Sequence, residues 1–326
     1  MKTQVNFTTS PDDVSRFADT ADFERFLSEN GFSGVELMVV GEGEQGLVAP
    51  KHVVGLHMSS FFTWIDLWEQ NEEGLLREFG TLDAAEAFYG GLTRGALVSR
   101  FKRDLENAHR FGVEYVVFHV SDIGSEEFFA LTSHRTDEEI ARATAELLGQ
   151  VFAGEDGQVA LLLENLWHPG LTFTRPEIAS YLLDAVPYGN TGFMFDTGHA
   201  FHTNWDIATQ AEGIRYIHGL LDGLDARGIA GAIRGVHLNQ SITGAYARAV
   251  AAAPPVLSSD TNERLFQNFT HAFKIDRHEP FSCPEAAGLV RRIAPDYLTF
   301  ELITESRAQL ERAVATQRCA LSGQPA

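Results

Sequence analysis

The chain alternates short apolar runs with longer amphipathic stretches. Eight runs rich in Val, Leu and Phe over 326 residues give about one every 41 residues, a spacing that suits a strand, a helix and their loops. Several runs are almost wholly apolar rather than alternating, which is typical of parallel strands buried on both faces. The predicted strands are Gln4–Thr8, Gly34–Val40, Val53–Met58, Tyr115–Val120, Val159–Glu164, Gly192–Asp196, Gly235–Asn239 and Tyr297–Leu302.

Amphipathic stretches with helix-end signals lie between these runs. The pairs Asn30-Gly31 and Phe111-Gly112 each close such a stretch with a glycine, as at many helix C-termini. Strands that alternate with helices favour parallel βαβ units, and eight such units predict a closed (β/α)8 TIM barrel. No glycine-rich phosphate loop follows the early strands, which argues against a nucleotide-binding fold. The predicted helices are Asp12–Asn30, Leu92–Phe111, Thr136–Phe152, Asp206–Arg227, Asp260–Phe273, Pro284–Ile293 and Glu305–Cys319.

Composition supports one folded domain. Hydrophobic residues make up 44% of the chain, the usual share for a folded protein. We expect a single barrel over residues 1–320 and a flexible tail over 321–326. The chain opens without a basic flank or an apolar run, and no apolar stretch approaches the roughly 20 residues of a membrane span. With only two cysteines as well, the expected compartment is the reducing cytoplasm.

The net charge bears on partners. Asp and Glu number 45 against 25 Lys and Arg, for a formal net charge of −20, and only four residues are lysine. A surface this acidic repels phosphate backbones and anionic lipids. We therefore expect a small-molecule substrate, with nucleic acid and membrane as improbable partners.

Polar residues terminate six consecutive strand-like runs. In a barrel, such positions share the C-terminal rim, where barrel enzymes keep their chemistry. Imidazoles and carboxylates are the ligand types of a divalent-cation site. Taken singly, each is an ordinary core histidine or loop carboxylate, but their recurrence predicts one shared metal site. The residues are His57, His119, Glu164 with Asn165, Asp196 with His199, His237 with Asn239, and Glu301.

A further pair lies in the segment KIDRHEP. Asp276 and His278 are two positions apart, and in extended backbone such side chains point the same way. The pair could hold one ion together, although alone it reads as an ordinary surface loop.

These residues and their order resemble the xylose isomerase-like TIM-barrel superfamily, also called AP endonuclease family 2. The superfamily includes sugar isomerases, sugar epimerases and endonuclease IV, and the resemblance spans roughly Gly34 to Ile303. The resemblance to the isomerases and epimerases implies one divalent ion, and the resemblance to endonuclease IV implies up to three. We expect zinc, with manganese or iron as alternatives. The implied ligand sets are Glu164, Asp196, His237 and Glu301 for the central ion, His57, His119 and Glu164 for a second, and His199, Asp276 and His278 for a third.

One departure from endonuclease IV concerns spacing. His237 and Asp276 are 39 positions apart, much farther than in endonuclease IV. We interpret the segment at about 241–273 as an insertion that changes the rim beside the third ion.

The resemblance implies two chemistries. A multinuclear site favours hydrolysis of a small phosphorylated or sugar-like substrate, with Glu164 and Glu301 as catalytic residues. The alternative is a sugar or sugar phosphate isomerase or epimerase, in which one central ion polarises the substrate and the same two carboxylates move a proton. An AP endonuclease on DNA is less favoured because the segment 59–80 carries five acidic residues and one arginine. A metal-binding barrel without turnover is the remaining hypothesis.

Several residues near the rim are candidates for binding substrate. Arg277 could hold a phosphate or a carboxylate, or could be a plain surface arginine. The aromatic residues of segment 59–80 could stack on a sugar ring or pack as a hydrophobic lid. The full candidate set is Arg277, Asn239, Asn165, Trp64, Trp167 and His168.

Overall fold

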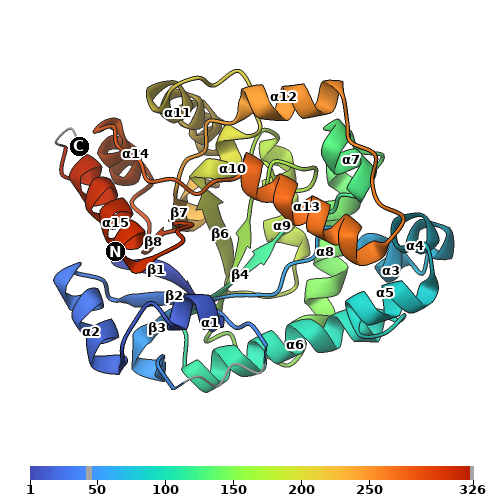
Figure 1. The fold of residues 1–326 in the computed structure, drawn as a ribbon, viewed down its shortest axis with the longest axis horizontal. Coiled ribbons are helices and arrows are strands. Elements are labelled where there is room, and N and C mark those ends of the chain that lie inside the picture. Colours follow the sequence, from blue (N-terminus) through green and yellow to red (C-terminus); the bar gives the residue numbers. More distant parts are fainter. Residues whose placement is uncertain (42–45, 324–326) are drawn as a thin grey trace.

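The computed structural model describes residues 1–41 and 46–323, and it confirms the predicted barrel. Eight parallel strands close on themselves in the order β1 to β8, and β1 pairs with β8 (Figure 1). Part of the tail predicted to be flexible, residues 324–326, lies outside the described residues. The strands are β1 (Lys2–Thr8), β2 (Gly34–Met38), β3 (Val53–His57), β4 (Tyr115–His119), β5 (Ala160–Glu164), β6 (Thr191–Asp196), β7 (Ile233–Leu238) and β8 (Tyr297–Phe300).

Helices surround the barrel, and most predicted helices are present with shifted ends. Local capping explains the shifts: Thr209 forms a capping box with Glu212, so that helix begins at Gln210 instead of Asp206. The helices are α1 (Pro11–Val14), α2 (Thr20–Glu29), α3 (Ile65–Glu69), α4 (Glu72–Phe79), α5 (Leu82–Tyr89), α6 (Arg94–Phe111), α7 (Ser125–Ala130), α8 (Asp137–Val151), α9 (Pro176–Ala185), α10 (Thr197–Phe201), α11 (Gln210–Ala226), α12 (Gly244–Ala252), α13 (Thr261–Ile275), α14 (Glu285–Ile293) and α15 (Arg307–Leu321).

One predicted helix is divided in two. The prediction of a single helix over Asp12–Asn30 is wrong, because α1 and α2 are separate elements. Asp19 between them has extended backbone, and its side chain accepts a hydrogen bond from the backbone N–H of Asp22. An aspartate in this conformation starts a new helix, which is why the apolar periodicity alone misjudged the break.

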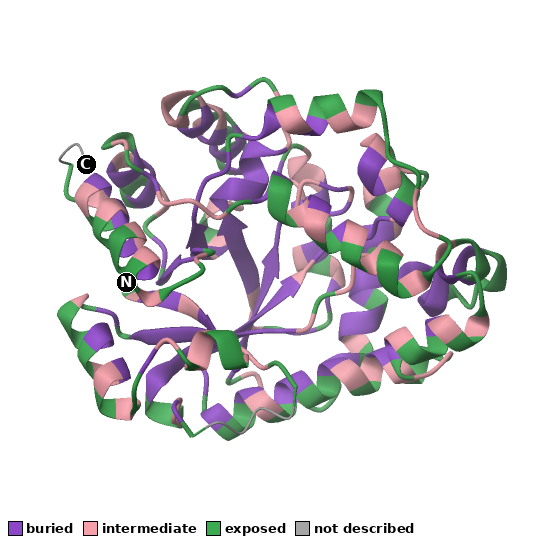
Figure 2. Cartoon of the chain, in the orientation of Figure 1, coloured by how far each residue is buried: buried purple, intermediate pink, exposed green. Residues whose placement is uncertain are grey.

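Apolar side chains pack both outside and inside the barrel. The larger core lies between the strands and the surrounding helices, and the strands are buried almost throughout (Figure 2). A smaller apolar cluster, which includes Val54, Val117, Leu162 and Met194, is separate from it. Within the described residues, no helix has the length and hydropathy needed to cross a membrane.

Three helices that come after β4 and β7 in the chain form a small cap. Helices α7, α12 and α13 pack against one another around a separate apolar cluster that includes Phe128 and Ile275 (Figure 1). The segment 241–273 thus carries α12 and most of α13. Because α13 ends at Ile275, it delivers Asp276 directly to the rim of the barrel.

Candidate metal centre

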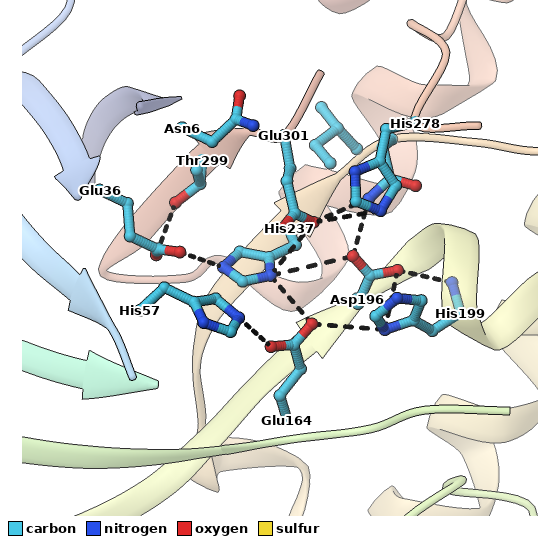
Figure 3. A network of polar contacts seen from close by, with 12 residues as sticks. Asn6, Glu36, His57, Glu164, Asp196, His199, His237, His278, Thr299 and Glu301 are labelled. Atoms are coloured by element: carbon cyan, nitrogen blue, oxygen red, sulfur yellow. Dashed lines mark hydrogen bonds and ion pairs between the residues drawn. The ribbon is translucent and has the colours of Figure 1, made fainter. Parts of the chain in front are cut away.

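The strand-end residues converge at the carboxyl ends of the strands. His57, His119, Glu164 and Asp196 are the last residues of β3, β4, β5 and β6, and Glu301 directly follows β8. The strand register places neighbours side by side, with His119 opposite Glu164 on the adjacent strand. Asp196 likewise lies opposite His237 of β7. Figure 3 shows the side chains of Glu164, Asp196, His237 and Glu301 pointing toward one another.

His57, His119 and Glu164 form the first of three candidate ligand groups. The Nε2 atoms of the two histidines lie 3.0 Å apart. Oε2 of Glu164 lies 3.3 Å from Nε2 of His57 and 3.1 Å from Nε2 of His119. Nδ1 of His57 lies 2.8 Å from the carbonyl oxygen of Met58, to which it donates, so neutral His57 carries its lone pair on Nε2. Tetrahedral ligands about 2.0 Å from a zinc ion are roughly 3.3 Å apart, so the three donor atoms have the spacing of a cation site.

The second group is a fully buried quartet at the barrel axis. It consists of Glu164, Asp196, His237 and Glu301, with one donor atom from each within 4.8 Å of the others. Nδ1 of His237 lies 3.1 Å from Oε1 of Glu164, 3.3 Å from Oε2 of Glu301 and 3.8 Å from Oδ2 of Asp196. Glu164 therefore faces both groups, Oε2 toward the first and Oε1 toward the second.

The third group differs from the implied set in one carboxylate. The structure groups Asp196 with His199 and His278. Asp276 lies beside them, with Oδ2 at 3.0 Å from Nε2 of His199 and 2.6 Å from Nε2 of His278. Asp276 also lies 3.5 Å from Nε2 of His202, a histidine that the strand-end pattern did not identify. Both carboxylates are thus within reach of the two histidines.

Two residues expected to bind substrate instead hold the ligands in place. The amide nitrogen of Asn239 donates to Oδ2 of Asp196 at 2.7 Å and to Oε2 of Glu301 at 3.1 Å. The side chain of Asn165 accepts from the backbone N–H of Asp196 and donates to its carbonyl oxygen. A Cβ on Gly198 would lie 1.9 Å from the amide oxygen of Asn239, so the glycine after Asp196-Thr197 leaves room for this contact.

The remaining candidate residues have different surroundings. Trp64 is buried, and its indole N–H donates to the carbonyl oxygen of Ser121, so it packs in the core rather than toward the ligand groups. Trp167 does face them, with its ring centroid 5.1 Å from that of His199. His168 is buried against Trp167. Arg277 extends from the rim with 56% of its side chain exposed and pairs with Glu279 at 3.0 Å.

Sequence reasoning missed Glu36, which contacts His237 on the side of the ring away from the quartet. Glu36 lies in the middle of β2, and Oε1 of Glu36 is 2.8 Å from Nε2 of His237 (Figure 3). A signal was present, because Glu36 is a charged residue inside the apolar run GVELM, on a strand expected to be buried on both faces.

The protein's own charges separate the pKa values of the two glutamates of the quartet. Burial raises the pKa of Glu301 to about 8. Burial acts the same way on Glu164, but the adjacent His237 and His119 outweigh it and hold the pKa of Glu164 well below its usual range. Two neighbouring carboxyl groups with separated pKa values are the arrangement that acid–base catalysts use.

Several histidines of the centre are biased toward the protonated form, whereas burial lowers the pKa of His119. Burial by itself lowers the pKa of His237, but Glu301, Glu36 and Glu164 outweigh it and hold the pKa well above the ordinary value. Asp196 and Asp276 do the same for the pKa of His199, and Asp276 and Glu301 raise the pKa of His278 to about 9 against burial. A cation must therefore displace protons from these rings.

Proton displacement predicts the pH dependence of metal binding. We expect zinc affinity to fall as pH is lowered from 8 to 6, because below their raised pKa values these histidines hold the protons that the cation must replace. Calorimetric titration in buffers of different ionisation enthalpy measures the protons released. Binding without proton release, and with the same affinity across this range, would contradict the prediction.

The donor set fits divalent cations. Imidazole nitrogens and carboxylate oxygens, with no thiolate among the grouped residues, are ligands for zinc, manganese or iron. The grouped residues are largely buried, and His119, with 24% of its side chain exposed, is the most exposed of them. The fold and site together define a (β/α)8 barrel with a candidate cation centre at the C-terminal rim.

Comparison with known proteins identifies the family. The chain belongs to the xylose isomerase-like TIM barrel family, whose sequence pattern matches residues 24–313. It is similar to an inosose isomerase of Bacillus velezensis (strain DSM 23117 / BGSC 10A6 / LMG 26770 / FZB42), with 31% identity over 122 residues. That stretch is 36% of this chain and spans 40% of the isomerase.

The chain is similar to solved structures. The crystal structure of the IOLI protein with a binding zinc atom has a TM-score of 0.50 and 15% identity, covering 98% of this chain and 96% of that one. The structure of D-psicose 3-epimerase in the presence of D-fructose has a TM-score of 0.49 and 11% identity, covering 99% and 97%. At these identities the likeness to the IOLI protein shows the barrel fold.

Proposed function

We propose that this protein is a divalent-cation-dependent isomerase or epimerase of a small polyhydroxylated carbonyl compound, such as a sugar or an inosose. The observation that carries this proposal is the buried quartet, in which Glu164 and Glu301 approach Nδ1 of His237 at 3.1 and 3.3 Å. Family membership and the partial similarity to an inosose isomerase support it over the hydrolysis that the sequence favoured.

The chemistry requires a base and an acid beside one carbon atom. A bound cation supplies Lewis acidity toward the oxygen atoms of the substrate. Glu164 is the candidate base that removes a proton from the carbon next to the carbonyl group. Glu301, which approaches the same nitrogen of His237, is the candidate acid that supplies a proton in return. In epimerisation a proton is added to the opposite face of the same carbon; in isomerisation it is added to the neighbouring carbon while a hydroxyl proton moves between the two oxygen atoms. Proton exchange with solvent then restores Glu164 and Glu301, so the reaction needs no oxidant and no second substrate.

A conversion assay tests this function. Protein loaded with zinc, manganese or iron would be incubated with aldoses, ketoses and inososes, and new isomers would be detected by NMR. We expect one isomer to form with the loaded protein and none after chelation. Loaded protein that converts none of these classes would count against the proposal.

Hydrolysis of a small phosphoester is the second candidate. The observation that favours it is the presence of two further ligand groups, which chemistry at one central ion does not use. Release of inorganic phosphate from sugar phosphates, with about three ions per chain by elemental analysis, would support it over isomerisation. Neither proposed reaction favours nucleic acid as a substrate, since the chain carries a net charge of −20. The acidic segment 59–80 contains the short helices α3 and α4.

Metal content also tests the third group. We expect Asp276→Ala to remove one ion and to leave the fold intact, because Asp276 contacts His199 and His278 of that group. Elemental analysis and circular dichroism would measure both properties. The matched control is Glu279→Ala in the same loop, whose carboxylate pairs with Arg277. Unchanged metal content in Asp276→Ala would exclude Asp276 as a ligand.

Zinc is the metal that we propose for the centre, since histidine and carboxylate ligands suit it, with manganese or iron as alternatives. A cytoplasmic location remains a prediction from the sequence.

A further inference from the structure

A polar layer lies inside the barrel directly beneath the quartet. Gln4, Glu36, Tyr115 and Thr299 come from four different strands, and Gln4, Tyr115 and Thr299 have no measurable exposure. Barrel interiors are usually filled by branched apolar side chains. Burying a carboxylate costs several kcal/mol unless other groups compensate it, so Glu36, which is 2% exposed, needs a physical reason to be there.

The contacts of Glu36 show how its charge is held. Oε1 of Glu36 lies 2.8 Å from Nε2 of His237. Oε2 accepts hydrogen bonds from the hydroxyl of Tyr115 at 2.6 Å and from the hydroxyl of Thr299 at 3.2 Å. Gln4 contacts both hydroxyl groups that donate to Glu36. Its amide nitrogen donates to the hydroxyl of Thr299 at 2.9 Å and contacts the hydroxyl of Tyr115. Among the described residues, the groups that contact Glu36 include neither Lys nor Arg, so His237 is its cationic partner.

The backbone makes room for this layer. A Cβ on Gly55 of β3 would lie 2.1 Å from the ring of Tyr115, so only glycine lets the tyrosine cross the barrel toward Glu36. Packing alone would not require this arrangement, because an apolar side chain at residue 36 with a larger residue at 55 would fill the same space. The layer is therefore built around the carboxylate.

The two nitrogens of His237 face different partners. Nδ1 faces Glu164, Glu301 and Asp196, and Nε2 faces Glu36 (Figure 3). A carboxylate on Nε2 keeps the proton there, which leaves the lone pair on Nδ1. Glu36 is on the far side of the ring from the quartet, so it acts on a cation through His237.

We propose that Glu36 is the positioning residue of the metal centre. Its carboxylate pairs with Nε2 of His237 at 2.8 Å, favours the tautomer that presents Nδ1 to the cation, and adds one negative charge on the side of the ring away from the quartet. Tyr115 and Thr299 hold the carboxylate in this position. The inference rests on the proposed function only in requiring a bound cation, and it holds for either reaction.

Competition titration with a chelator tests the role of Glu36. Zinc and cobalt affinities would be measured for the unaltered protein and for Glu36→Gln, which keeps the side-chain shape and removes the charge. We expect Glu36→Gln to bind the metal about 10- to 100-fold more weakly. The visible spectrum of bound cobalt should also change, which a role in packing alone would not produce. The matched control is Asp104→Asn, another buried carboxylate, whose partner Ser59 is outside the ligand groups.

The outcomes separate this inference from the proposed function. Metal binding by the unaltered protein, together with equal affinity and an equal cobalt spectrum in folded Glu36→Gln, would overturn the role of Glu36 and leave the proposed function standing. No metal binding by the unaltered protein would overturn both. If Glu36→Gln fails to fold, Tyr115→Phe tests the inference in its place. This variant removes one hydrogen bond to Glu36, so it should also weaken metal binding, by a smaller factor. Unchanged affinity in Tyr115→Phe would then overturn the inference.

Discussion

Replacing Glu164 with Gln is expected to remove cations from two of the three ligand groups and to lower the conversion rate by about 10³-fold or more. The reason is that Oε2 of Glu164 faces His57 and His119, while Oε1 faces His237. Glutamine keeps the shape of the side chain but loses the charge that a shared ligand contributes to both groups. Elemental analysis and initial rates on loaded protein measure the two effects.

The control for Glu164→Gln is Asp104→Asn, which removes a buried carboxylate outside the ligand groups. We expect the control to keep its metal content and its rate. A Glu164→Gln protein with unchanged metal content would contradict the bridging position of Glu164.

Replacing Glu301 with Gln is expected to lower the conversion rate and to weaken cation binding by the quartet, while the first ligand group keeps its ion. The conversion rate should fall by about 10²- to 10⁴-fold, the contribution of one positioned acid or base. The group formed by His57, His119 and Glu164 should keep its ion, because Glu301 is not part of it. Rates as a function of substrate concentration should show the loss in kcat, since Glu301 is proposed to act in proton transfer.

The measurement for Glu301→Gln is made on metal-loaded protein, so that incomplete loading does not imitate lost catalysis. The control is the nearby surface variant Glu305→Gln, which follows β8 by several residues and is outside the ligand groups. A Glu301→Gln protein as active as the unaltered one would exclude Glu301 as the catalytic acid.

Periodic features of the sequence predict the barrel and the candidate ligands at the ends of its strands. Parallel strands buried on both faces give continuous apolar runs, so the eight strands could be located from local composition. The ends of the runs are equally local, and they identify His57, His119, Glu164 and Asp196 without any knowledge of contacts. Closure then brings these ends to one rim, because all strands of such a barrel are parallel.

Roles that depend on side-chain direction could not be read in the same way. Asn165 and Asn239 lie one and two positions after candidate ligands in the sequence, and only the structure shows that their amides hydrogen-bond to Asp196 and Glu301. Trp64 lies in a segment that could have covered the pocket, but it donates to a backbone carbonyl in the core. Each of these outcomes is set by a partner far away in the chain.

The sequence by itself therefore determined the fold, the family and the residues at the strand ends, because strand burial and strand termination are local properties. Only the tertiary structure decided which atoms of these residues meet, including the two oxygen atoms of Glu164 and the contacts of Asp276 with His199 and His278. It also showed Glu36, which is 201 positions from His237 in the sequence and 2.8 Å from it in space. Contacts across a closed barrel join residues whose separation along the chain carries no information about their distance.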